Sequence, residues 1–122
     1  MNMRRVVSFL IPGITYLNDQ PVWPVGVTPL TSDQITAADL PAAQAAAIAK
    51  AKATESDRIY AQYPAYAQTN AALGLYNALP TSDPFYPANL TAGIQAVLSA
   101  EHAAEDAINA LTTSSAVDAF SW

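Results

Sequence analysis

The side chains with the greatest chemical capacity lie within about one helical turn: Glu101, His102, Glu105 and Asp106. His102 is the only histidine, and Glu105 follows it by three residues, a spacing that puts both on one helix face and suits metal ligands. A di-metal carboxylate bundle, however, needs a Glu-x-x-His pair on each of two helices and two further glutamates. The chain has three glutamates in all, and the order here is reversed. We therefore expect no metal site and a solvated His102.

Other catalytic arrangements lack their essential residues. A Ser-His-Asp system would depend on His102 with no recognisable motif around it, and no cysteine is present as a nucleophile or metal ligand. The four glycines lie too far apart for a phosphate-binding loop. We predict no catalytic residues and no cofactor. The alternative, a small enzyme or ligand carrier, would use Glu101 and His102 with Arg58 around a pocket.

Glu101 is also a structural question, because the apolar positions before and after it place it near the buried face of its helix. A buried carboxylate needs a partner, and Arg58 on the preceding long helix is the natural candidate. The alternative is that Glu101 lies at the edge of the apolar face and reaches water. The sequence leaves both open.

The composition excludes several classes of function. Ten acidic and five basic residues give a pI near 4.4, which is unsuited to a nucleic-acid backbone. The apolar run from Val6 to Leu17 is too short to span a bilayer, and Pro12 and Gly13 interrupt it, so we expect neither a membrane segment nor a signal peptide. Much of the hydrophobic content is alanine, which predicts a thin core.

The first 31 residues contain four prolines and many β-favouring side chains, which predicts an extended N-terminal arm. Two short strands are expected at Arg5–Ile11 and Ile14–Leu17, with a bend at Pro12-Gly13. Asn18-Asp19 marks a second turn before Val22-Trp23.

Alanine-rich, helix-favouring sequence begins after Thr31, whose neighbours can cap a short helical turn. Prolines and apolar spacing then predict three helices and a final short turn: Ala42–Gln62, Ala65–Leu79, Pro87 or Asn89 to Leu111, and Ala116–Phe120. The predicted fold is mainly α, a three-helix antiparallel bundle or helical hairpin with an extended or short β-hairpin N-terminal arm. Its parts are an arm of residues 1–31 and a helical domain of residues 32–122.

The aromatic and apolar residues of the arm, of one loop and of the C-terminus are the candidate partner-binding residues. A lone two-stranded hairpin is marginal in water, so the arm must lie on the helices or join a sheet of another chain. A terminal tryptophan is usually ordered only when something docks it. The candidates are Val7, Phe9, Ile11, Tyr16, Trp23, Phe85, Tyr86 and Trp122.

Two stretches carry a resemblance to a known class of proteins. The first stretch is the alanine-rich Ala42–Tyr63, which includes Glu55-Ser56-Asp57-Arg58-Ile59. The second begins at Gly93-Ile94-Gln95-Ala96-Val97 and ends at Ala119-Phe120-Ser121-Trp122. They resemble the C-terminal helical parts of small tailed-bacteriophage tail and tail-fibre-assembly proteins. The resemblance covers roughly the last two thirds of the chain. It consists of alanine-rich helices, a turn of the Glu-x-Asp-Arg type and a closing short helix that ends in tryptophan. It implies a role in the virion or its assembly through protein–protein contacts, with no catalytic residues to transfer.

The function expected from this resemblance is that of a non-enzymatic structural or adaptor component of a tailed-phage virion. Its partners would be other virion or assembly proteins or copies of itself, and not nucleic acid or membrane. The resembled chaperones often have a more charged sequence and a disordered front half, whereas this front half is built to be ordered. That difference favours a virion component over the alternative, an assembly chaperone in the host cytoplasm.

Overall fold

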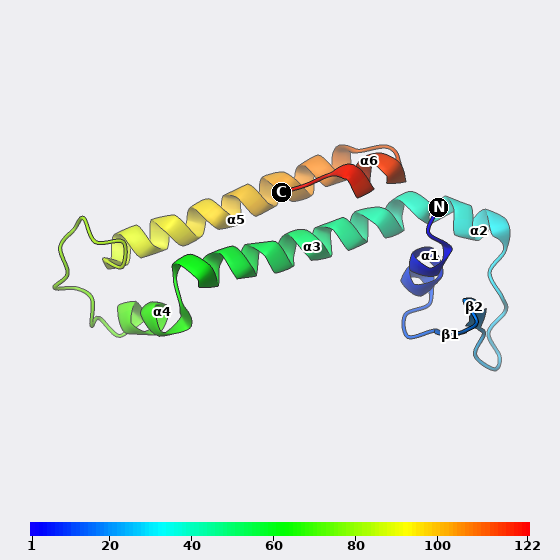
Figure 1. The fold of residues 1–122 in the computed structure, drawn as a ribbon, viewed down its shortest axis with the longest axis horizontal. Helices are drawn as coiled ribbons and strands as arrows, with labels where there is room; N and C mark the ends of the chain where they lie inside the picture. The colour runs from blue at the N-terminus through cyan, green and yellow to red at the C-terminus, as the bar shows by residue number, and fades with distance from the viewer. The chain divides into compact units, whose positions relative to one another are not determined.

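The computed structural model describes residues 1–122 and is mainly helical, which confirms the predicted fold class at that level (Figure 1). The elements in chain order are α1 (Met3–Leu10), β1 (Thr15–Leu17), β2 (Gln20–Val22), α2 (Ser32–Ala37), α3 (Asp39–Gln62), α4 (Ala65–Ala72), α5 (Pro87–Ala110) and α6 (Ser114–Ala119). The residues form two compact units. Unit 1 comprises Met1–Ile48 and Ile108–Ser121, and unit 2 comprises Ala49–Ala107 and Trp122.

The first element of unit 1 corrects the prediction of a strand at Arg5–Ile11, because Met3–Leu10 is a helix. The side chain of Asn2 caps it by accepting a hydrogen bond from the Arg5 backbone N–H at 3.0 Å. No proline lies within the helix, since the first one is Pro12. Valine lowers the stability of a helix by only a few tenths of a kcal/mol relative to alanine, and burial of its side chain can offset this cost. The burial of Val6 and Val7 therefore overrides their preference for strands.

A two-stranded hairpin follows α1. β1 and β2 pair antiparallel, with Thr15 opposite Val22, and the predicted turn at Asn18-Asp19 is confirmed. Both turn residues have positive φ, 50° and 62°, as a two-residue hairpin turn of type I′ requires. The Tyr16 hydroxyl donates to the Arg4 carbonyl at 2.9 Å, so the hairpin is held on α1.

The core of unit 1 joins α1 to the start of α3. Val6, Ala38 and Ala42 are buried together, with Ile35 of α2 packed against them. The predicted cap at Thr31 is confirmed, since its side chain and that of Gln34 form a reciprocal capping box.

The C-terminal residues of unit 1 are tied to its N-terminal residues by polar contacts. Arg5 pairs with Asp118 of α6 at 2.7 Å. Ser114 donates to the carboxylate of Asp39 at 2.7 Å. The Gln44 side chain donates to the Leu111 carbonyl at 3.3 Å, just beyond the end of α5. Within this unit the start of α3 therefore lies beside the end of α5, in antiparallel direction.

In unit 2, α4 ends at Ala72, seven residues before the predicted Leu79. Gly74 takes a positive φ of 78°, the Gly74 N–H bonds to the Ala71 carbonyl, and the Leu75 N–H bonds to the Asn70 carbonyl. This pattern is a Schellman C-cap, in which glycine provides the left-handed residue. The predicted helix was too long because apolar residues at helical spacing continue to Leu79, beyond the glycine that ends the helix.

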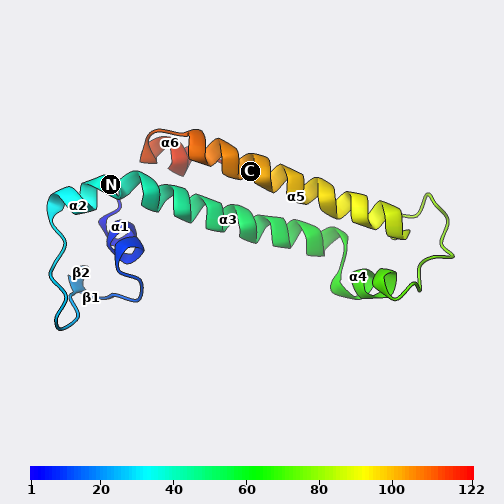
Figure 2. The same cartoon turned by 180° about the vertical axis from the view of Figure 1, so that it is seen from behind.

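Unit 2 brings the second part of α3 beside the first part of α5, again antiparallel, as Figures 1 and 2 show from opposite sides. The Tyr63 ring lies directly over Gly93, where an added Cβ would overlap it. Phe85 then stacks on Tyr76 with ring centroids 5.9 Å apart and lies tilted against Tyr63 at 6.5 Å.

No helix in the structure is both long and apolar enough to cross a membrane.

Candidate functional site

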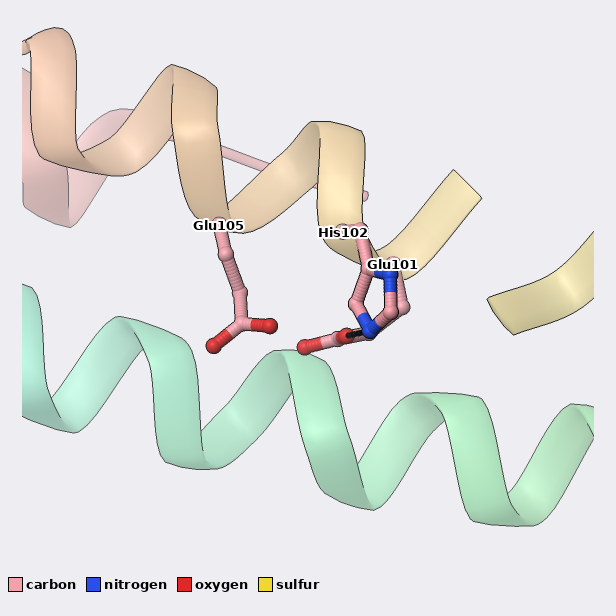
Figure 3. A group of neighbouring side chains, drawn as sticks. All are labelled: Glu101, His102 and Glu105. Atoms are coloured by element: carbon pink, nitrogen blue, oxygen red, sulfur yellow. Dashed lines mark ion pairs between the residues drawn. The ribbon is translucent and has the colours of Figure 1, made fainter. Parts of the chain in front are cut away.

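The strongest chemical cluster lies in unit 2 and consists of Glu101, His102 and Glu105 on α5 with Lys52 on α3. Figure 3 shows the three α5 side chains reaching from their helix toward the neighbouring one. One ligand atom from each of Glu101, His102 and Glu105 lies within 4.8 Å of the others. We refer to these three residues as the acidic cluster.

Glu101 is fully buried, with a relative exposure of 0%, and is the only charged residue so placed. The prediction that it faces inward is confirmed, and the alternative that it reaches water is wrong. As a carboxylate, neither of its oxygens receives a hydrogen bond. Buried polar groups are almost always satisfied, so an unsatisfied buried carboxylate indicates that the site is completed by a proton or by a cation.

The partner expected for Glu101 is wrong, because the nearest cation is Lys52 instead of Arg58. The Lys52 Nζ lies 3.8 Å from Glu101 Oε1 and 3.2 Å from Glu105 Oε1. Arg58 is about 9 Å further along the axis of α3, since each residue advances a helix by about 1.5 Å. Its guanidinium lies over the Trp122 ring, 4.2 Å from the centroid.

The pKa values of Glu101 and Glu105 are shifted in opposite directions. Burial raises the pKa of Glu101, and the adjacent Glu105 raises it further. The ammonium of Lys52 lowers the pKa of Glu105, and Glu105 in turn raises the pKa of Lys52. A protonated Glu101 can donate a hydrogen bond to an ionised Glu105. Paired carboxyl groups with opposite shifts are the usual arrangement for holding a proton between them.

His102 completes the cluster from the solvent side. Its side chain is 71% exposed, as expected of a surface histidine, and its Nε2 lies 3.8 Å from Glu101 Oε2. It places an imidazole nitrogen next to two carboxylate groups. The chemistry available at this place is therefore cation or proton binding, and no serine, threonine or cysteine lies among these residues as a nucleophile.

The candidate partner-binding residues are divided between the two units. Val7 is fully buried and belongs to the core of unit 1, so its prediction as a contact residue is wrong. In a helix, unlike a strand, the neighbouring Val6 and Val7 can both face inward. Phe9 is 43% exposed, whereas Ile11, Tyr16 and Trp23 are half-buried in the same unit.

The remaining three candidates lie in unit 2 and are half-buried: Phe85, Tyr86 and Trp122. Phe85 packs on Tyr76 and Tyr63, and Trp122 packs on Arg58. They contribute to the structure of this unit and expose only part of their surface.

Unit 1 contains a stretch of exposed large apolar residues, which we name the apolar segment and define as residues 9–27; of its exposed residues the sequence interpretation named only Phe9. Its exposed large side chains are Phe9, Leu10, Leu17, Val22, Val25 and Val27. Beside it lies an open groove of about 410 Å³, lined by Phe9, Leu10, Leu30, Gln34, Ala37, Ala38 and Pro41. The signal was present as an apolar composition, but burial could not be assigned without the correct secondary structure.

No family model matches this chain, and neither a curated protein nor a solved structure is significantly similar to it.

Proposed function

We propose that this protein is a non-enzymatic adaptor that acts through protein–protein contacts made by the apolar segment. The observation that carries the proposal is the exposure of six large apolar side chains within 19 residues, Val25 being entirely exposed. Exposed apolar surface favours association, because burying it on a partner contributes about 25 cal/mol per Å².

The segment is held in a defined position before it meets a partner. Val6 anchors α1 in the core of unit 1, and Tyr16 ties the hairpin to α1 through the Arg4 carbonyl and the Ser8 hydroxyl. A preformed contact surface costs less conformational entropy on binding than a disordered one. This arrangement supports a permanent structural contact.

We place the adaptor in the virion of a tailed bacteriophage, with other virion proteins or further copies of the chain as its partners. The support for this setting is the resemblance of Ala42–Tyr63 and of Gly93–Trp122 to phage tail and assembly proteins. An assembly chaperone is the alternative, and it differs in being absent from the finished particle. As the scaffold we propose an antiparallel helical hairpin or three-helix bundle, supported in each unit by the contacts between its parts of α3 and α5.

The test compares two matched substitutions, Leu17→Asp in the apolar segment and Leu73→Asp in unit 2. The two leucines are 68% and 69% exposed, so both changes add the same charge at the same exposure. We expect concentration-dependent self-association of the full-length chain in sedimentation velocity, lost in Leu17→Asp and kept in Leu73→Asp. Equal behaviour of the two variants would contradict the use of the apolar segment as a contact surface.

A further inference from the structure

We propose that Glu101, Glu105 and His102 form a binding site for a divalent transition metal of the zinc class, with water as the fourth ligand. The site is independent of the apolar segment, which lies in the other unit. The proposal departs from the sequence-based expectation of no metal, and the reason is the burial of Glu101 together with its two neighbouring donors.

The ligand chemistry fits zinc. Zinc binds histidine nitrogen and carboxylate oxygen, and zinc sites with three protein ligands leave a fourth position for water. Zinc bonds of about 2.0–2.2 Å place tetrahedral ligand atoms roughly 3.4 Å apart. Glu101 Oε2 and His102 Nε2 already lie 3.8 Å apart, and all three donors lie within 4.8 Å. Side-chain movements of about 1 Å would bring the three donor atoms to the spacing of a tetrahedral zinc site.

Glu101 supplies the observation that distinguishes this place from an ordinary acidic surface. Its carboxylate is fully buried, receives no hydrogen bond and has only ion-pair contacts at 3.8 Å, with Lys52 and His102. It is directed toward the other two members of the cluster (Figure 3). A buried carboxylate without donors is costly unless a proton or a cation neutralises it. A metal ion bound to Glu101 would satisfy the oxygens that the chain leaves unsatisfied.

Lys52 is the cation beside these carboxylates and would move away on metal binding. Its Nζ lies within 3.8 Å of Glu101 and 3.2 Å of Glu105, but its side chain is 59% exposed. An exposed lysine can turn into water at little cost, whereas an ammonium held beside the metal would repel it. Lys52 is therefore a competitor of the metal.

The experiment is calorimetric titration of the full-length chain with Zn²⁺, together with NMR of the imidazole. Because His102 is the only histidine, its ring resonances are assigned without ambiguity. We expect one equivalent of Zn²⁺ to bind and to shift these resonances. Absence of binding at millimolar Zn²⁺ would overturn the proposal.

Variants locate the ion. Removing outer partners of metal ligands typically weakens binding by about 10–100-fold, so loss of a ligand in Glu105→Gln should weaken it by at least about tenfold. Asp106→Asn, next to it and exposed, is the matched control and should bind as the parent does. Equal affinity of Glu105→Gln and the parent would overturn the site, because the ion would then be bound elsewhere.

The competition with Lys52 is tested separately. Lys52→Met should tighten Zn²⁺ binding several-fold, and Lys50→Met, another exposed lysine of α3, should leave it unchanged. Weaker binding in Lys52→Met would contradict the placement of the ion between Glu101 and Glu105. Far-UV circular dichroism of each variant ensures that the compared chains are folded.

Discussion

Replacement of Gly93 by alanine tests the helix contact that positions the acidic cluster. In unit 2 the Tyr63 ring lies so close to Gly93 that an added Cβ would overlap its hydroxyl and ring carbons. In an exposed helix the same change would stabilise the protein by about 1 kcal/mol, because glycine is a poor helix former. The packing and the helix propensity therefore predict effects of opposite sign.

The magnitude follows from these two effects. Forcing an extra carbon into a packed contact costs about 1–3 kcal/mol, here by displacing Tyr63 from Gly93 and from Phe85. After subtraction of the propensity gain, Gly93→Ala should lower the free energy of unfolding by about 1 kcal/mol, which corresponds to roughly 4 °C in Tm. The displacement should also disturb the pairing of Lys52 with Glu105, since Tyr63 directly follows α3 and its contact with Gly93 lies between the same part of the chain and α5.

The assay is urea unfolding followed by circular dichroism, in the parent chain and in a Tyr63→Ala background. Without the ring, Gly93→Ala should recover its helix propensity and stabilise the chain by about 1 kcal/mol. The sign of the alanine effect thus reverses between the two backgrounds. If Gly93→Ala stabilises the parent as much as it stabilises Tyr63→Ala, the close approach of α3 and α5 in unit 2 is refuted.

Three further predictions concern Glu101, Val6 and Gly74. Burial raises the pKa of Glu101 above its ordinary 4.5, so the folded state binds the proton more tightly than the unfolded state, and stability falls as pH rises from 4.5 to the raised pKa. In the presence of a chelator, Glu101→Gln should therefore be more stable than the parent at pH 7, with a gain that shrinks as the pH falls to 4.5; urea midpoints across this range measure it, and a constant gain would argue against titration of Glu101. Val6→Ala removes two buried carbons and should cost about 1.6 kcal/mol, whereas Val25→Ala should cost almost nothing; equal thermal shifts would show that Val6 is not in the core. Gly74→Ala, at a φ of 78°, should destabilise the chain by about 1–2 kcal/mol in thermal unfolding, and an unchanged Tm would rule out the left-handed C-cap of α4.

The long helices were predictable because their signals are local. Alanine and other strong helix formers cover α3, and prolines mark the boundaries at Pro64 and Pro87. The turn at Asn18-Asp19 was predictable for the same reason, since these residues tolerate positive φ.

The errors arose where tertiary contacts decide the outcome. The β-branched residues of α1 favour a strand locally, and the burial of Val6 against Ala38 and Ala42 favours the helix. The apolar spacing placed Glu101 near the buried face of its helix and left its burial open, because its surroundings depend on the register between α3 and α5. The sequence contains no local signal for that register, so Arg58 was chosen where Lys52 is found.

The central claim is that the apolar segment is the contact surface of this protein. Hydrogen exchange of the full-length chain at increasing concentration measures it directly, with the loop at residues 73–86 as an internal reference. We predict that amide protection in residues 9–27 rises with concentration while the reference loop is unchanged. Protection that is the same at every concentration, or that rises only in unit 2, would contradict the claim.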